Sequence, residues 1–188
     1  RTIKIVNHIH NGFGCARVAL EDDYHHFRVQ VEYANGFVTE VTGEAFRTPY
    51  TLCGQAVAVL PTLRGMPLSL NPTAITRYGD QRQHCTHMLD ESGLAITAAA
   101  GKIQQRLYEI EVPRHVNGVT RPRLWRDQVL LLEWTVESNV IQSPATYAGV
   151  SIGRGMSRWT QNTLDSEAAE AALLLRRCAM ISLGRLHN

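Results

Sequence analysis

The sequence predicts an α+β fold in which antiparallel β-hairpins pack against two or three helices, in a single domain over residues 1–188. Three observations predict it. Residues 1–50 alternate in β-rich segments, later segments shift to a helical period, and most connections between strands have hairpin character. Apolar residues make up 44% of the chain and charged residues 19%, which is typical of a globular protein with a real hydrophobic core.

The N-terminal part is expected to consist of strands. The segments HHFRVQVEY and FVTEVTGEAF alternate between polar and apolar residues. Asn35-Gly36 between them predicts a tight hairpin turn, because both residues tolerate positive φ. Two shorter strands are expected upstream, TIKIV and ARVAL.

Two helical segments are expected after these strands. Residues 50–64 have apolar side chains at helical spacing, and Pro61 is expected to kink or end that helix early. A loop rich in Gly, Pro and Asn follows. A second helix is expected over residues 86–105, with Thr86 as its N-cap.

The C-terminal part is expected to be a hairpin followed by a helix. Residues 107–112 and 124–141 form the predicted hairpin, which turns near Asn117-Gly118. The last helix is expected over residues 166–186, with Asp165 or Ser166 as its cap. Its apolar packing is expected from Leu173, Leu174, Cys178, Ile181 and Leu186.

Charge and hydropathy disfavour two classes of partner. The formal net charge is +2 and no concentrated basic face stands out, so nucleic-acid binding is not expected. No apolar run approaches the length of a membrane span, so a membrane span is not expected. A homodimer is one expected state of the chain.

The four cysteines, at positions 15, 53, 85 and 178, are widely scattered and form no CxxC pair. This spacing predicts free thiols and a cytoplasmic protein rather than a secreted disulfide scaffold. The sequence starts at Arg1 without a Met, which leaves a cleaved upstream segment open.

The segment HCTHMLD at residues 84–90 places four reactive groups in seven residues. A helix that begins near Thr86 would put His87 and Asp90 on one face, with His84 and Cys85 just before its positive end. That end favours a thiolate and a neutral imidazole. Three interpretations stay open: an acid–base centre, a metal site, or a polar helix start.

A second group of candidates lies in EDDYHHF, residues 21–27. In a strand, Asp23 and His25 would share one face, and Asp22, Tyr24 and His26 the other. An Asp–His pair on one sheet face suits general acid–base chemistry, because the carboxylate fixes the imidazole tautomer. A solvated strand end is the alternative.

The segment EAFRTPYTLC supplies a third group. Arg47 closes the strand, and Tyr50 and Cys53 lie near a helix start, so these residues are candidates for substrate contact. A metal site would need a third ligand besides the HxxH pair, from His25, His26, Asp22, Asp23 or Cys53, and no second tight ligand cluster such as CxxC is present. Neither a metal nor another cofactor is therefore expected.

These stretches together resemble domain-of-unknown-function family 2889, a bacterial family. The resemblance covers about residues 15–105 and lies in DDYHHF, EAFRTPYTLCGQAVAVLPTLRGMPLS and HCTHMLD. His84 departs from the family pattern, which has a glycine there. The resemblance implies a small bacterial domain and supplies no assigned catalytic residues. It implies one recurring arrangement of Asp23, His25, His26, Arg47, Cys53, Cys85 and His87.

The expected function is a cofactor-independent lyase or isomerase that uses general acid–base residues on a small apolar terpenoid or aromatic substrate, for example in opening a terpenoid epoxide. The alternatives are a non-catalytic binding module for an apolar or acyl ligand or a protein partner, and a metal-assisted hydrolase. The expected catalytic residues are Asp23, His25, His26, His87 and Asp90. The expected substrate contacts are Arg47, Tyr50, Cys53, Cys85 and Trp134.

Overall fold

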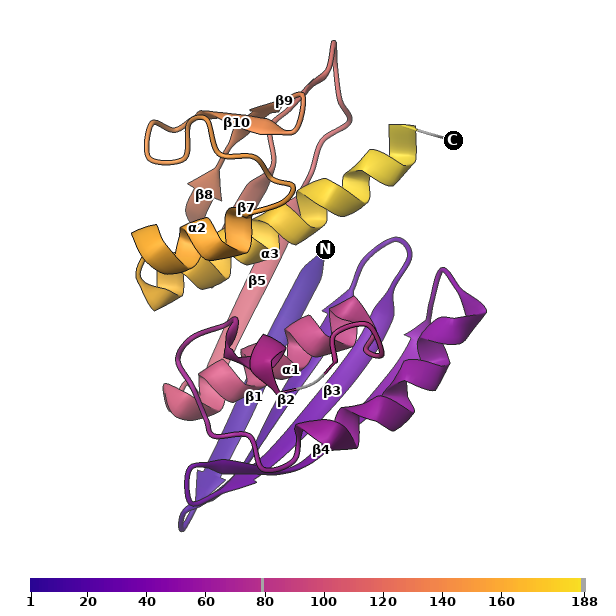
Figure 1. The fold of residues 1–188 in the computed structure, drawn as a ribbon, viewed down its shortest axis with the longest axis vertical. Helices are drawn as coiled ribbons and strands as arrows, with labels where there is room; N and C mark the ends of the chain where they lie inside the picture. The colour runs from indigo at the N-terminus through magenta and orange to yellow at the C-terminus, as the bar shows by residue number, and fades with distance from the viewer. Residues whose placement is uncertain (79, 187–188) are drawn as a thin grey trace. The chain divides into compact units, whose positions relative to one another are not determined.

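A computed structural model describes residues 1–78 and 80–186 of the chain (Figure 1). The protein is of the predicted α+β class, with antiparallel sheets and helices. Its backbone forms two compact units, one over Thr2–Leu107 and one that contains Arg1 and the chain from Tyr108 onward. No helix in the described residues is both long enough and apolar enough to cross a membrane.

The first unit is built on a four-stranded antiparallel meander in the order β4-β3-β2-β1. Its strands are β1 (Thr2–His10), β2 (Phe13–Glu21), β3 (His26–Ala34) and β4 (Phe37–Arg47). The predicted hairpin at Asn35-Gly36 is confirmed, with φ values of 52° and 83° at these residues. β1 and β2 are longer than expected, because Asn11-Gly12 makes a second tight turn with positive φ.

The two faces of this sheet differ in polarity. Alternate residues of the strands are buried under α1 (Thr86–Ala100) and η1 (Thr51–Leu63), which cover one face (Figure 1). The buried side chains include Ile3, Ile5, Ala16, Val18, Val29 and Val31. The residues between them, such as Lys4, Arg17 and Arg28, are exposed on the opposite face.

Tyr33 joins three elements of this core. Its hydroxyl donates to Asn7 Oδ1 at 2.7 Å, and Asn7 Nδ2 donates to the backbone carbonyl of Ala98 at 3.3 Å. The Tyr33 ring occupies the space that a Cβ atom on Gly14 would need. The glycine in β2 therefore makes room for a tyrosine on β3, and the tyrosine secures β1, which in turn bonds to α1.

α1 begins at Thr86 as expected, but its cap residue and its end differ from the expectation. Cys85, and not Thr86, is the N-cap residue, and the helix ends at Ala100 rather than at residue 105. Gly101 is the C-cap, and its backbone N–H bonds to Thr97 O. The following residues turn into β5 (Gln105–Glu111), because Gln104 O accepts from the backbone N–H of Asn7. Pairing with the sheet thus ends the predicted helix early.

Residues 51–63 form a 3₁₀ helix, η1, instead of an α-helix. Pro61 lies inside η1 and does not end it. Of the predicted apolar face, only Leu60 and Leu63 are buried. Leu60 packs against β4 at Gly43, where a Cβ atom would overlap its side chain, so packing on the sheet decides the helix geometry here. A short 3₁₀ turn, η2 (Ala74–Arg77), follows in the predicted loop.

The second unit contains β-strands in two antiparallel arrangements. One has the order β5-β7-β8, with β7 (Arg123–Arg126) and β8 (Val129–Glu133). The other has the order β10-β9-β6, with β6 (Val119–Thr120), β9 (Thr135–Glu137) and β10 (Val140–Ser143).

The expectation of one strand run over residues 124–141 is wrong. Pairs of non-glycine residues with positive φ, Asp127-Gln128 and Ser138-Asn139, turn the chain twice within this run. β5 nevertheless pairs with β7, as the predicted hairpin required, with Tyr108 opposite Arg126. Asn117-Gly118 also turns as predicted, with φ values of 52° and 80°.

Helices close the second unit. α2 (Met156–Thr163) was not expected from the sequence. α3 (Ser166–Ser182) begins as expected, because Asp165 accepts a bond from Ala168 N at 2.8 Å, and η3 (Leu183–Leu186) replaces its last predicted turn. Leu174 and Cys178 are buried as expected, whereas Leu173 and Ile181 are only half-buried.

The substitution Gly14→Ala is expected to lower the free energy of unfolding by about 2 kcal/mol or more, because the new methyl group would overlap the Tyr33 ring. Gly54→Ala is the matched control, since a Cβ atom at Gly54 meets nothing within 4 Å. Urea denaturation of both variants measures the difference. Equal stability of the two variants would contradict the packing of Tyr33 on Gly14.

Candidate functional site

The candidate site lies at one end of the first unit, where the turn between β2 and β3 meets the start of α1. His25 lies in that turn and His87 in the first turn of α1. The centres of their imidazole rings are 4.0 Å apart and the ring planes make an angle of 33°. The sequence placed these two histidines in separate motifs, and the fold brings them into contact.

Asp22 organises the turn that carries His25. Its Oδ1 atom accepts from the backbone N–H groups of Tyr24 and His25, both at 2.8 Å, and pairs with His25 Nδ1 at 2.9 Å. The Asp22 and His25 side chains are 12% and 6% exposed, so this contact is shielded from water. A single carboxylate therefore fixes both the turn and the orientation of the imidazole.

The predicted placement of Asp23 and His25 on one face of a strand is wrong. β2 ends at Glu21 and β3 begins at His26, so residues 22–25 form a turn and strand alternation does not apply to them. Asp22 takes the role expected of Asp23, whose own side chain is exposed. The sequence carried a signal for this, because aspartate bonds readily to backbone N–H groups two or three residues later.

Apolar packing surrounds the two imidazoles on one side. Phe27 lies 5.7 Å from His25 and 5.9 Å from His87 between ring centres, with the Phe27 and His87 planes nearly parallel. His25 is 5% exposed and Phe27 is fully buried, whereas His87 is half-buried. Of the two rings, His87 is therefore the one open to a ligand.

Arg47 braces the same turn from the end of β4. Its Nη2 atom donates to the backbone carbonyl of Asp22 at 2.6 Å and to Glu21 Oε1 at 2.9 Å. The side chain is about half exposed. The described contacts of Arg47 hold the Asp22 turn, and the predicted contact with substrate stays a prediction.

Cys85 caps α1 without becoming acidic. Burial raises the pKa of its thiol, and this outweighs the opposing effect of the backbone N–H groups of His87 and Met88. The nearby Cys53 thiol and the Glu91 carboxylate also raise the Cys85 pKa. The sequence predicted that the helix start would favour a thiolate, and desolvation reverses that expectation. Glu91 is completely buried, which the sequence did not predict.

His84 is buried beside η1. Its Nε2 atom lies 3.4 Å from Thr62 Oγ1, and no hydrogen-bond partner of its buried Nδ1 atom is described. Burial lowers the pKa of His84, and the Asp80 carboxylate opposes this only in part.

Asp90, one turn of α1 beyond His87, is half-buried.

Three other predicted residues have different surroundings from those of the imidazole pair. His26 contacts the exposed Phe46 ring at 4.8 Å between centres, so it does not join His25 and His87. Tyr50 is 73% exposed. Trp134 belongs to the second unit, where its fully buried ring packs against Tyr147.

The site is rich in groups that can carry protons. Over residues 1–78 and 80–186, no group of three or more His, Cys, Asp or Glu side chains is arranged to hold a metal ion. Cys15, Cys53, Cys85 and Cys178 are free thiols. The arrangement of Asp22, His25 and His87 can bind a proton, orient an imidazole and present a second imidazole to a ligand.

Comparison of the chain with family models, curated proteins and solved structures found no match. The resemblance to domain-of-unknown-function family 2889 therefore stays a prediction. The function proposed below rests on the contacts among Asp22, His25 and His87.

His84 is expected to make stability depend on pH. Its pKa in the folded protein lies below the ordinary value of 6.5, so the unfolded chain binds more protons as the pH falls below that value. The contribution of His84 to the free energy of unfolding has its full value above pH 6.5. It decreases below pH 6.5, until the folded protein also binds the proton. Urea denaturation from pH 7.5 to pH 5 should show a smaller loss in His84→Gln than in the wild type. An equal loss in both proteins would contradict the desolvation of His84.

The Cys85 thiol is expected to react slowly with iodoacetamide at neutral pH. Because burial raises its pKa above the ordinary value of 9.0, the thiolate fraction is smaller in the folded protein than in the unfolded chain. Peptide mass spectrometry can follow alkylation of Cys85 over a pH series, with and without urea. The alkylation rate should rise at a higher pH in the folded protein than in urea. A midpoint of this rise at a lower pH in the folded protein would contradict the prediction and show that the helix start dominates.

Proposed function

We propose that the protein is a cofactor-independent lyase or isomerase that works by general acid–base catalysis on a small apolar molecule. The observation that carries this proposal is the contact of the His25 and His87 rings, 4.0 Å apart, with one ring held by the shielded Asp22 carboxylate. We also propose a cytoplasmic protein without a bound cofactor.

The Asp22 carboxylate sets the tautomer of His25. An ionised carboxylate can only accept hydrogen bonds, so the proton of the 2.9 Å contact lies on His25 Nδ1. In this proposal, Asp22 and His25 act together as the acid.

His87 is suited to the opposite role. His87 is the more exposed ring of the tilted pair, so in this proposal it is the ring that meets the substrate as a base. A neutral imidazole open to a ligand can remove a proton from it.

The aromatic surroundings suit an apolar substrate. Phe27 packs along both imidazoles, and Tyr24 nearby is 41% exposed. In the isomerisation of a terpenoid epoxide, an acid would give a proton to the ring oxygen as the C–O bond breaks. A base would take a proton from the neighbouring carbon, which yields an allylic alcohol without any co-reactant.

A non-catalytic binding module is the second candidate, and the burial of His25 favours it. The His25 ring is 5% exposed and could reach a ligand only through His87. In a binding module, Asp22, His25 and His87 would serve to stabilise the turn and the start of α1. A third candidate, metal-assisted hydrolysis, is tested by elemental analysis of the purified protein.

The substitution His87→Ala is expected to lower turnover roughly 100-fold, the usual scale for a general acid or base. The assay is the conversion of a panel of monoterpene epoxides and small aromatic catabolites, followed by gas chromatography. His26→Ala is the matched control, because His26 lies next to His25 in sequence but contacts Phe46 instead.

Conversion that is lost in His87→Ala and kept in His26→Ala would support catalysis by the imidazole pair. Equal activity in the two variants would contradict it. Binding of the same compounds by the wild type without any conversion, measured by changes in the NMR spectrum, would favour the binding module.

A further inference from the structure

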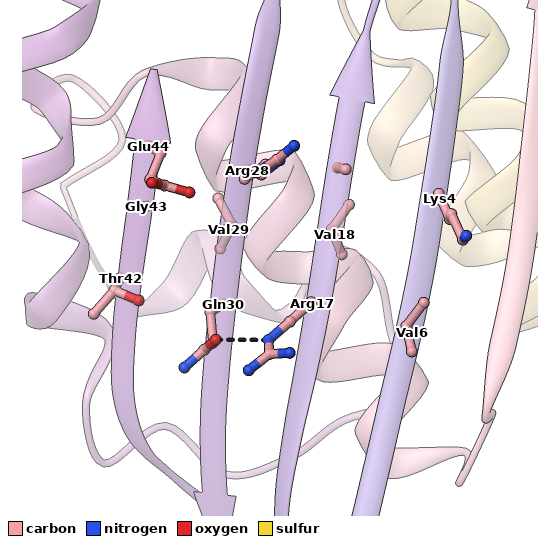
Figure 2. Close-up of a pocket in the computed structure, with 11 residues that line it drawn as sticks. Lys4, Val6, Arg17, Val18, Arg28, Val29, Gln30, Thr42, Gly43 and Glu44 are labelled. Carbon is pink, nitrogen blue, oxygen red and sulfur yellow. Dashed lines mark hydrogen bonds between the residues drawn. The ribbon is translucent and has the colours of Figure 1, made fainter. Parts of the chain in front are cut away.

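The face of the first unit opposite to α1 and η1 carries a hollow of about 760 Å³ (Figure 2). Two rows of directly opposed residues cross the four strands within it. One row is Lys4, Ala19, Arg28 and Glu44, and the other is Val6, Arg17, Gln30 and Thr42. The volume lies in the range of small-molecule sites, and none of these residues belongs to the imidazole pair.

Positive charge prevails in the hollow. Lys4, Arg17 and Arg28 project from three neighbouring strands, and Glu44 is the carboxylate among the residues that line it (Figure 2). In the described part of the chain no salt bridge joins these three cations to a carboxylate. Glu44 lies opposite Arg28 in the sheet register but makes no such bridge with it.

Neighbouring side chains hold the two arginines in place. Arg17 Nε donates to Gln30 Oε1 at 2.8 Å, and Gln30 Nε2 donates in turn to Glu32 at 3.0 Å. The Arg28 guanidinium lies 4.8 Å from the centre of the Phe46 ring, a cation–π contact. Ordering of these long side chains before binding reduces the entropy that a ligand would otherwise cost.

We propose that this hollow binds a small organic anion with two or more negative charges, as carboxylate or phosphate groups, and a short apolar part. The anionic groups bond to Lys4, Arg17 and Arg28, which present charged N–H donors. The apolar part lies on Val6 and Ala19, the half-buried residues between them.

The distribution of carboxylates favours a small anion over a nucleic acid. The next row across the strands is His8, Cys15, Glu32 and Glu40. Two carboxylates thus lie directly beside the cations, and Glu44 lies within the hollow itself. A long polyanion would meet all three carboxylates, whereas an anion confined to the hollow would meet only Glu44.

Inorganic pyrophosphate is the probe, because it is small and carries several negative charges. Isothermal titration of the full 188-residue chain at low ionic strength is expected to give a Kd of about 1 mM or lower. Arg28→Gln and Lys4→Gln should each weaken binding about tenfold, since each removes one charge-assisted contact. Arg77→Gln, at another exposed arginine of the same unit, is the matched control and should bind like the wild type.

Three results would overturn the proposal. These are no measurable binding at about 10 mM pyrophosphate, an equal loss of affinity in Arg77→Gln, or tighter binding of a short single-stranded oligonucleotide than of pyrophosphate through the same residues. Far-ultraviolet circular dichroism of each variant verifies its folding. Lys4 and Arg28 lie at separate exposed positions, so if one of the two variants fails to fold, the other still tests the proposal.

Discussion

The architecture of the candidate site depends on the hydrogen bonds that the Asp22 carboxylate accepts. One oxygen atom accepts two backbone N–H bonds and the His25 ring, so the same interaction shapes the β2–β3 turn and orients an imidazole. Arg47 holds the backbone of this turn from β4. Loss of that carboxylate would therefore disturb the end of the sheet and the chemistry of the site together.

Burial and the helix start act in opposite directions on Cys85. Backbone N–H groups at the beginning of α1 favour a thiolate, yet desolvation raises the pKa of Cys85. At His84, desolvation lowers the pKa, the direction that the helix start also favours. Both groups are thereby kept neutral near pH 7. The shielded Asp22–His25 contact lies next to a half-buried His87. Because the Cys85 thiol at this end of the unit is kept neutral, proton transfer is a better proposal than thiolate chemistry.

The sequence predicted features that depend on local signals. The Asn35-Gly36 turn and the Asp165 cap follow from residues a few positions apart, and both are present. It failed where tertiary packing decides, as in η1, whose geometry follows from contact with β4. The pairing of His25 with Asp22 was missed because a turn replaced an expected strand. The contact of His25 with His87 joins residues more than sixty positions apart, which local patterns cannot specify.

The turns Asn11-Gly12 and Asn35-Gly36 are neighbours, since the backbone N–H of Asn35 bonds to the carbonyl of Gly12. They lie at the opposite end of β2 and β3 from Asp22 and His25, separated by the full length of nine-residue strands. Exposed turn tips tolerate inserted residues well. A fluorophore, an affinity tag or a fused reporter domain attached there would be held by the rigid sheet while leaving the imidazole pair untouched. Immobilisation through this end would attach the first unit to a surface at the end of its sheet opposite to the candidate site.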